Sequence, residues 1–239
     1  MEGEAVEEST EVPDFNSIEE YQEWVNSEDW YQTIWLREGM VTKGKFRTDD
    51  RLPLLRGLQF AGKRVLDIGC NSGQYSLYAS AMGARDVVGI DVDTNRIRQA
   101  RTLARNEGLN AEFHIRGLDE VADFGQFDIV LCFAVLTEIE NVLGALRTIR
   151  EVTGERAILE MGLAKPVGYL SRNRSWWKRD QRVSRKGRTA ELRRHRHAGW
   201  VMFPTLEIIA DLFGDEFIVR HEGIGLRYDR VTVERKASS

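Results

Sequence analysis

Two acidic residues and a short glycine loop are the first residues of this chain that could bind a small molecule. Asp67 stands at the end of an apolar run, and the loop after it contains Gly69, Asn71 and Gly73. Glycines at such a turn let the backbone approach a ligand closely. Asp91 ends a second apolar run, 18 residues after Gly73. An acid at that point is placed to accept hydrogen bonds from both hydroxyls of a ribose.

The composition of the loop discriminates between nucleotide cofactors. The dinucleotide fingerprint has glycine at its first, third and sixth positions, whereas this loop has Asn71 and Gln74 at the last two. The loop also lacks the Lys and Ser or Thr of a P-loop, so both a pyrophosphate and a nucleoside triphosphate are disfavoured. Asp67 is predicted to orient a bound ammonium group, directly or through water.

The elements that must position these residues alternate between strand and helix. Apolar runs predict strands at 64–68, 86–90, 111–115, 127–135 and 157–161, with closing strands at 217–222 and 230–234. Periodic segments predict helices at 75–82, 94–107, 141–152 and 205–213. Gly83, Gly108 and Gly154 are expected to end the first three helices. The alternation predicts a parallel sheet with helices on both faces and ligands beyond the carboxyl ends of its strands.

Four motifs on these elements resemble the class I S-adenosylmethionine-dependent methyltransferases. They are VLDIGCNSG at 65–73, VVGIDVD at 87–93, GLDE at 117–120 and FDIVLCFAVLTEI at 127–139. The resemblance implies a Rossmann-like, doubly wound α/β fold with a mostly parallel seven-stranded sheet, a helical N-terminal cap and an insertion before the last helix. It implies a methyltransferase with S-adenosyl-L-methionine as cofactor and S-adenosyl-L-homocysteine as product. We expect no metal site.

The resemblance also implies a role for each matching residue near the loop. Gly69, Asn71 and Gly73 would line the methionine part and the sugar of the cofactor. Asp91 would hold the ribose hydroxyls, and Val92 would lie against the adenine.

Three further cofactor residues are implied by the later motifs. Leu118 and Asp119 would contact the adenine ring and its exocyclic amine. Phe133 would lie near the sulfonium, with an ordinary core position as the alternative. Cys70 and Cys132 are predicted to be small buried apolar residues rather than nucleophiles.

A looser resemblance points to the bacterial tRNA wobble-uridine carboxymethyltransferases. The segments WLREGMVTKGKF, DDRLPLL, Phe203-Pro204 and RYDRVTV match in order. That family binds a carboxylated cofactor and contacts its extra carboxylate with a Lys and a Tyr, where this chain has Thr48 and Thr137. Because that carboxylate would be left unpaired, we expect ordinary S-adenosylmethionine. Arg227 matches a family Arg in the last strand and would face the cofactor end.

Charge is concentrated in two segments of a chain whose net charge is −4. Residues 1–30 hold eleven acids and no Lys or Arg, and residues 172–197 hold eleven Lys and Arg against two acids. Aromatic rings among cations can stack a planar group and pair a phosphate. The candidate substrate-binding residues are Trp176, Trp177, Arg193, Arg194, Arg196 and Arg227. Because RNA-binding domains are usually basic overall, we favour an anionic or sugar-like small molecule, with RNA as the second candidate.

General-base catalysis has three candidate residues. His195 and His197 end the basic segment, and Glu138 follows the fourth strand. A cationic surface is the alternative for both histidines, and a helix N-terminal acid is the alternative for Glu138. His221 is predicted to be structural. Because no base is assignable with certainty, a non-catalytic S-adenosylmethionine-binding partner subunit is a third hypothesis for the function.

Five segments are predicted along the chain. They are a disordered acidic tail at 1–12, a helical cap over the cofactor site at 13–50, the cofactor-binding core at 51–163, a basic substrate insertion at 164–203, and a C-terminal helix with closing strands at 204–239. Aromatic residues at helical spacing from Asp14 to Leu36 predict amphipathic helices in the cap. The absence of a signal peptide and of a long apolar run predicts a cytoplasmic protein without membrane contact. The oligomeric state stays open.

Overall fold

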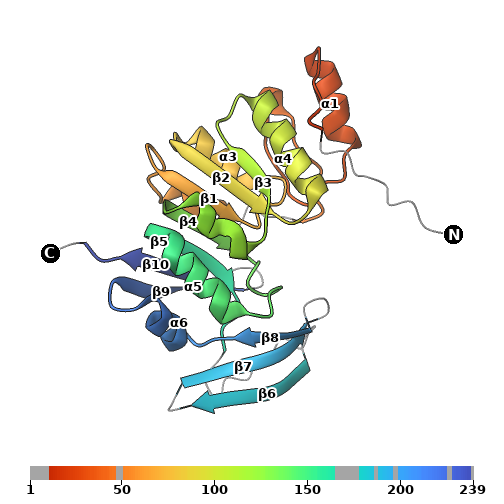
Figure 1. Ribbon diagram of the computed structural model, residues 1–239. Coiled ribbons are helices and arrows are strands. Elements are labelled where there is room, and N and C mark those ends of the chain that lie inside the picture. The colour runs from red at the N-terminus through yellow and green to blue at the C-terminus, as the bar shows by residue number, and fades with distance from the viewer. Residues whose placement is uncertain are drawn as a thin grey trace. The chain divides into compact units, whose positions relative to one another are not determined.

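The structure is a computed structural model that describes residues 11–46, 51–164, 178–185, 188–195, 199–224 and 228–237, with the backbone alone at 178–185, 188–195 and 199–201. The chain divides into two compact units, residues 1–117 and 118–239 (Figure 1). These are called the first and the second unit below.

The first unit consists of three parallel strands and their helices. Its elements are α1 (Ile18–Ser27), η1 (Arg37–Gly39), α2 (Leu52–Arg56), β1 (Arg64–Ile68), α3 (Gln74–Ala81), β2 (Asp86–Asp91), α4 (Thr94–Glu107) and β3 (Glu112–Ile115). Strand β2 lies between β1 and β3, with Leu66 opposite Val88 and Val88 opposite Glu112. Strands β1 and β2 are apolar along most of their length because helices cover a parallel sheet on both faces.

Helix α4 forms over the predicted range because both of its ends carry capping residues. The Asp93 side chain accepts hydrogen bonds from the backbone N–H groups of Asn95 and Arg96 at the N-terminus. Gly108 ends the helix with a φ of 66°, a left-handed conformation that glycine adopts without steric cost.

The N-terminal segment is less helical than predicted. Helix α1 ends at Ser27, and the chain then continues to residue 46 without a further α-helix. This stretch contains η1 and isolated bridges between Gln32 and Phe46 and between Trp35 and Val41. We call residues 28–46 the strap. The prediction of helix as far as Leu36 was wrong because short aromatic segments fit more than one period.

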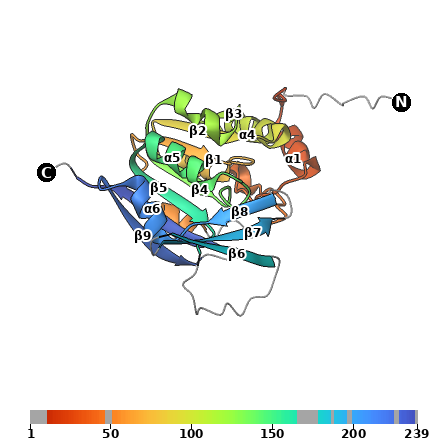
Figure 2. The same cartoon turned by 60° about the horizontal axis from the view of Figure 1, so that its bottom comes forward.

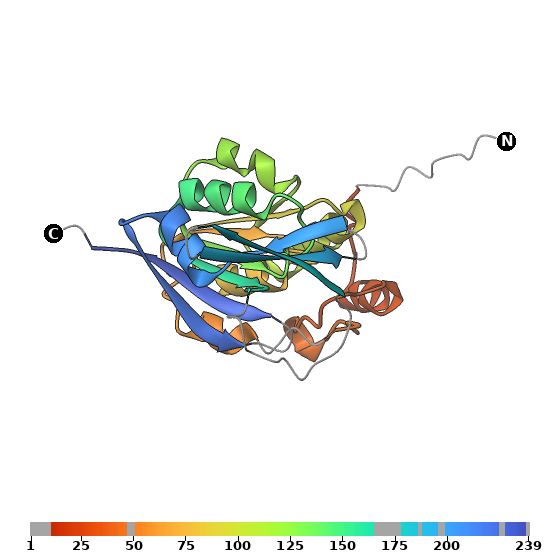
Figure 3. The same cartoon turned by 90° about the horizontal axis from the view of Figure 1, so that it is seen from below.

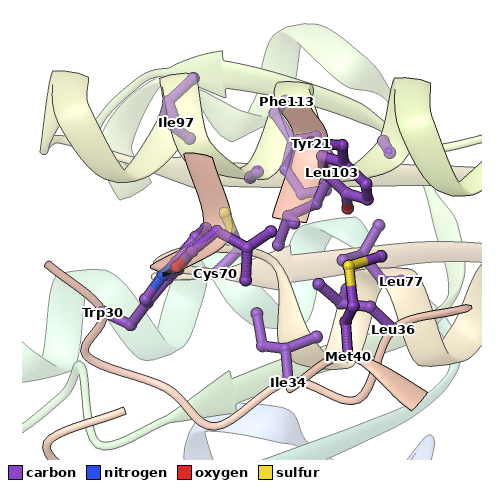
Figure 4. Close-up of a cluster of buried hydrophobic side chains, with 13 residues drawn as sticks. Tyr21, Trp30, Ile34, Leu36, Met40, Cys70, Leu77, Ile97, Leu103 and Phe113 are labelled. Carbon is purple, nitrogen blue, oxygen red and sulfur yellow. Dashed lines mark hydrogen bonds between the residues drawn. The ribbon is translucent and has the colours of Figure 1, made fainter. Parts of the chain in front are cut away.

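The strap packs into the apolar core of the first unit. Trp30, Ile34, Leu36 and Met40 are at most 9% exposed and belong to one cluster of buried side chains. Figure 4 shows them facing residues of the glycine loop, of α3 and of α4. That cluster also contains Cys70, which is fully buried as predicted and whose thiol pKa is raised well above its ordinary value by burial.

The second unit contains the remaining elements. They are η3 (Leu118–Phe124), β4 (Phe127–Phe133), α5 (Val142–Val152), β5 (Thr153–Met161), β6 (Lys178–Arg185), β7 (Arg188–His195), β8 (Gly199–Phe203), α6 (Leu206–Phe213), β9 (Phe217–Ile224) and β10 (Asp229–Arg235). Strands β4 and β5 are parallel, and β10 is antiparallel to both β5 and β9. Figure 3 shows the long β9–β10 hairpin next to β5.

Helix α5 ends where predicted, but Gly154 does not have the role predicted for it. The helix ends at Val152, and Gly154 already belongs to β5. A Cβ atom at Gly154 would lie 2.9 Å from the carbonyl oxygen of Phe127. Glycine is therefore used here for close approach of β4 and β5 rather than for ending a helix.

The strands form the predicted seven-stranded, mostly parallel sheet in the order β3-β2-β1-β4-β5-β10-β9. Residues 178–203 add a separate three-stranded antiparallel sheet in the order β6-β7-β8 (Figure 2). No strand was predicted in this stretch, because its many charged residues do not alternate with apolar residues in the pattern that indicates a strand.

Candidate cofactor site

The glycine loop after β1 makes a tight left-handed turn. Gly69, Asn71 and Gly73 have φ values of 69°, 53° and 87°. Asn71 adopts this conformation because asparagine tolerates the left-handed region better than most residues. The backbone N–H groups of Gly69 and Cys70 donate to the carbonyl oxygen of Ile90 at 2.8 and 2.9 Å. The loop is thereby tied to the end of β2.

Asp91 joins the end of β2 to this loop. Its Oδ2 accepts a hydrogen bond from the backbone N–H of Asn71 at 2.9 Å, and its Oδ1 accepts one from that of Asp93 at 3.0 Å. Burial raises the pKa of the Asp91 carboxyl. Each carboxylate oxygen has a second lone pair, so both can still accept a ribose hydroxyl. The next residue, Val92, is 73% exposed and offers an apolar surface for a flat ring.

Asp67 is a buried carboxyl group at the end of β1. It is 1% exposed, and its Oδ2 accepts a hydrogen bond from the Ser76 hydroxyl at 2.7 Å. The pKa of Asp67 is raised to about 7, chiefly by burial and also by the nearby charge of Asp91, against the opposing effects of the Ser76 hydrogen bonds and of Arg51. This group fits an ammonium ligand, since a neighbouring cation would restore its ionised form.

Arg51 is a cation near Asp67 to which the sequence analysis gave no role. It precedes α2, and its Nη1 donates to the Tyr75 hydroxyl at 3.1 Å, with the guanidinium 5.9 Å from the centre of the Tyr75 ring. Its segment, DDRLPLL, resembles the carboxymethyltransferases only by its place in the order of motifs. A single Arg in a sequence carries no signal of the carboxyl group that it will face.

The predicted site residues of the second unit that precede α5 lie on η3, at the end of β4 and in the turn that follows β4. Leu118 and Asp119 begin η3, half-buried and exposed respectively, and Phe133 ends β4 with 6% exposure. Ala134 follows with a φ of 64°, which is unusual for a residue other than glycine. Glu138 is exposed, and its backbone N–H donates to the carbonyl oxygen of Val135 at 2.9 Å.

Most of the predicted substrate residues cannot be placed. Trp176, Trp177, Arg196, His197 and Arg227 lie outside the described residues. The backbone of Arg193, Arg194 and His195 belongs to β7, where Arg193 pairs with Arg179 and Arg194 with Lys178 of β6. The register therefore brings four cationic residues to neighbouring positions of this small sheet.

His221 has an acidic partner in the second unit. Its Nε2 lies 3.0 Å from Oδ1 of Asp229, whose Oδ2 accepts a hydrogen bond from the backbone N–H of Leu163 at 3.2 Å. These contacts join β9, β10 and the end of β5, as the structural role predicted for His221 requires.

Two features are absent from the ranges that the structure describes. These ranges contain no group of three His, Cys, Asp or Glu that could hold a metal ion. Nor does any helix there have the length and apolar character needed to cross a membrane.

A glycine loop after β1, an acid at the end of β2 and a seven-stranded sheet with one antiparallel strand together define the class I S-adenosylmethionine-dependent methyltransferase fold. Residues 65–155 match the family described as "Methyltransferase domain". The N-terminal domain of EvdMO1, solved in the presence of SAH and D-fucose, matches 92% of this chain and 96% of its own, with a TM-score of 0.64 and 19% identity.

Curated relatives share the same core. The chain is 34% identical over 113 residues to the ribosomal protein L11 methyltransferase of Chromobacterium violaceum, covering 47% of this chain and 37% of that protein. It is 30% identical over 94 residues to the tRNA U34 carboxymethyltransferase of Campylobacter hominis, covering 39% and 33%. It is 30% identical over 145 residues to the ubiquinone biosynthesis O-methyltransferase of Psychrobacter cryohalolentis, covering 55% and 54%.

These comparisons confirm the predicted family resemblance and the predicted fold. The family uses S-adenosylmethionine, the cofactor that the resemblance of the four motifs implies. The chain spans between one third and about half of the length of these three relatives. Their named substrates are a ribosomal protein, a tRNA and a small molecule, so the relatives do not select an acceptor class.

Proposed function

We propose that this chain is an S-adenosylmethionine-dependent methyltransferase that acts on a small-molecule acceptor, by O- or N-methylation. The observation that carries the cofactor part of the proposal is the position of Asp91, whose Oδ2 accepts a hydrogen bond from the backbone N–H of the loop residue Asn71 at 2.9 Å. A ribose seated on this carboxylate would lie directly over the glycine loop. The buried carboxyl of Asp67 is then the acceptor for the ammonium end of the cofactor.

The chemistry asked of the protein is modest. S-adenosylmethionine carries an activated methyl group on its sulfonium, and the protein mainly holds the acceptor in line with it and excludes water. Gly69, Asn71 and Gly73 would line the cofactor, and Val92 would contact its adenine. Leu118, Asp119 and Phe133 complete the proposed cofactor set.

The acceptor side of the proposal rests on charge. The net charge of −4 disfavours a general affinity for RNA, whereas the cationic pairs of β6 and β7 favour an acceptor with a local negative charge. Trp176, Trp177, Arg193, Arg194, Arg196 and Arg227 are the proposed acceptor-binding residues. His195, His197 and Glu138 are the proposed candidates for a general base, which a hydroxyl or amine acceptor often needs.

RNA is the second candidate acceptor, favoured by the same pairing of Arg193 and Arg194 with cations of β6. RNA binding would weaken steeply as the salt concentration rises, because binding to phosphates releases counterions. A third candidate is a partner subunit that binds the cofactor without transferring methyl groups.

The first test is calorimetric titration of the purified chain with S-adenosylmethionine, S-adenosylhomocysteine and NAD. We expect the two sulfur compounds to bind and NAD not to bind. Asp91→Asn should weaken their binding at least tenfold, because the ribose hydroxyls lose a charged acceptor. The matched control is Asp86→Asn at the other end of β2, where the carboxylate pairs with Arg64 at 2.7 Å. Equal effects of both variants would contradict the site.

The acceptor test follows on the wild-type chain. Methyl transfer would be measured with sugars, phosphorylated metabolites and bulk tRNA side by side, with D-fucose as the first sugar. Turnover with a small molecule alone supports the proposal. Turnover with tRNA alone would indicate that RNA is the acceptor. Cofactor binding without turnover on any acceptor would favour a partner subunit that does not transfer methyl groups.

A further inference from the structure

We infer that the strap holds the glycine loop in its cofactor-binding conformation through two buried amide side chains, Gln32 and Gln99. Both are positioning residues: they contact the loop and the start of α3. The inference rests on the proposed function in one respect, that the cofactor binds at this loop. All the contacts that carry it lie within the first unit.

Gln99 connects the loop to the beginning of the strap. This α4 residue is fully buried, and its Oε1 accepts a hydrogen bond from the Ser72 hydroxyl at 2.8 Å. Its Nε2 donates to Oε2 of Glu28 at 2.9 Å and to the carbonyl oxygen of Asp29 at 3.1 Å. The partner of the Gln99 amide oxygen is a hydrogen-bond donor, and the partners of its amide nitrogen are acceptors. These partners therefore determine which way the Gln99 amide is oriented.

The carboxylate that receives Gln99 is itself held in place. Both oxygens of Glu28 accept hydrogen bonds from Nη2 of Arg98 at 2.7 Å. The Arg98 and Glu28 side chains are only 17% and 15% exposed, so this ion pair is partly shielded from water. Asn71 continues the chain of contacts on the loop side, since its Oδ1 accepts a hydrogen bond from the backbone N–H of Ser72 at 2.9 Å.

Gln32 caps the helix that follows the loop. Gly73 is the N-cap residue of α3 and has no side chain with which to bind the free N–H groups of the first turn. Gln32, which is 3% exposed, supplies the missing acceptor, because its Oε1 lies 3.2 Å from the backbone nitrogen of Gln74. The Gln74 side chain returns a hydrogen bond to the carbonyl oxygen of Thr33 at 3.0 Å.

Hydrogen bonds and close packing hold the strap backbone in place around Gln32. Thr42 accepts a hydrogen bond from the backbone N–H of Ile34 and donates one to the carbonyl oxygen of Gln32, both at 2.7 Å. A Cβ atom at Gly44 would overlap the backbone of Gln32 and Thr33. Figure 4 shows Trp30 and Ile34 of the strap beside Cys70 of the loop, so apolar packing supports the same arrangement.

The backbone conformation of the glycine loop explains why it needs support from Gln32 and Gln99. Three of its five residues from Gly69 to Gly73 have left-handed backbone conformations, one of them an asparagine. Glycine adopts this conformation without steric cost but loses more backbone freedom than any other residue when it is fixed, so such a loop needs surrounding contacts to keep one conformation. A loop held in advance binds its ligand more tightly, because less conformational freedom is lost on binding.

The test compares Gln99→Leu and Gln32→Leu with Tyr21→Phe. The control removes a hydrogen bond of 3.0 Å between Tyr21 of α1 and Glu107, at the other end of α4 from Gln99. We expect the two Leu variants to raise the Kd for S-adenosylhomocysteine about tenfold, the equivalent of about 1.4 kcal/mol. The control should destabilise the fold without changing the Kd. Calorimetry gives the Kd, and urea unfolding gives the stability.

Amide hydrogen exchange of residues 69–74, measured without cofactor, distinguishes a loop that is no longer held in place from a fold that is less stable as a whole. Exchange in this segment should be faster in both Leu variants than in the control at equal stability. If a Leu variant fails to fold, Ser72→Ala removes only the hydroxyl that meets Gln99 and replaces it in the series.

Two results would overturn the inference. One is a Kd in the glutamine variants equal to that of the control, and the other is unchanged exchange at residues 69–74. If the wild-type chain binds neither sulfur compound, the proposed function fails instead. The exchange measurement then decides by itself whether the strap fixes the loop.

Discussion

At the scale of single residues, Asp67 has the most consequential environment in the first unit. Its carboxyl is buried at the end of β1, and burial raises its pKa to about 7. A carboxyl with a raised pKa binds its proton more tightly in the folded than in the unfolded chain. Ionisation therefore opposes folding, and stability decreases as the pH rises from the unfolded pKa toward the folded one.

This sign leads to a pH prediction. Between pH 4 and pH 7, the free energy of unfolding of the wild-type chain should fall relative to that of Asp67→Asn, by about 2–4 kcal/mol in total. Urea unfolding at pH 5 and pH 8 measures the difference. Parallel pH profiles of the two proteins would show that Asp67 is not responsible.

The same carboxyl should make cofactor binding depend on pH. Affinity for S-adenosylhomocysteine should increase as the pH rises through about 7, because only the ionised Asp67 attracts the ammonium group. Calorimetric titrations at pH 6 and pH 8 check this. In Asp67→Asn the increase should be smaller and the affinity lower at both values; an unchanged increase would assign the effect to another group, such as Asp91.

Gly73 offers a test of the loop at the same scale. Its φ is 87°, and an added Cβ would lie 2.9 Å from the Phe113 ring, so Gly73→Ala should cost about 2–3 kcal/mol of stability. Gly108→Ala is the matched control, since its φ is 66° and no heavy atom lies within 4 Å of the new Cβ. We expect about 1 kcal/mol there. Equal losses in urea unfolding would mean that contact with Phe113 is unimportant.

At the scale of elements, α4 links the proposed cofactor site to the strap. Its N-cap, Asp93, comes two residues after Asp91, and its second turn carries Gln99. The same helix thus begins next to Asp91, the carboxylate proposed to bind the ribose, and holds the amide that contacts the loop. A helix is suited to this, because its internal hydrogen bonds keep such groups at constant spacing.

The cap of α4 can be tested separately from its charge. Asp93→Ala should lower stability by about 1 kcal/mol, because the N–H groups of Asn95 and Arg96 lose their acceptor. Asp93→Asn should retain most of the stability, since asparagine is an equally good N-cap. Thermal unfolding of the two variants gives the comparison. Similar losses in both would indicate that charge rather than capping matters at this position.

At the scale of the whole molecule, cofactor binding and acceptor binding are proposed for segments of different charge. The basic residues gather in the stretch that forms β6 and β7, while the cofactor motifs match residues 65–155. We expect the triple variant Arg193→Gln, Arg194→Gln and Arg196→Gln to weaken acceptor binding about tenfold or more and to leave the Kd for S-adenosylhomocysteine unchanged.

The control for this variant is a matched loss of charge elsewhere. Arg56, Arg85 and Arg147 are exposed, and replacing all three with Gln changes the net charge by the same amount. KM for the acceptor and Kd for S-adenosylhomocysteine would be measured for both triple variants. If only the variant of Arg193, Arg194 and Arg196 loses affinity for S-adenosylhomocysteine, the basic segment would contribute to cofactor binding instead.

Much of the fold could be predicted because it depends on local pattern. The bounds of β1 and α4 agree with the prediction to the residue. Both elements are determined by neighbouring residues: a continuous apolar run for the strand, and Asp93 and Gly108 as caps for the helix. The motif order likewise predicted the class of fold, because each motif is short and stands at the end of its own strand.

Tertiary structure alone decided how the loop is held. Gln99 meets Glu28 across 71 residues of sequence, and Gln32 meets Gln74 across 42. A glutamine looks alike in a sequence whether it is exposed or buried, and its partners are set by packing between distant elements. The course of the strap was not predicted for the same reason. It depends on hydrogen bonds of Thr42 and on packing against core residues that are distant in the sequence. The sequence by itself determined the strands of the seven-stranded sheet and the cofactor class, because both depend on short local motifs. Packing and hydrogen bonds between distant segments decided how the glycine loop is supported.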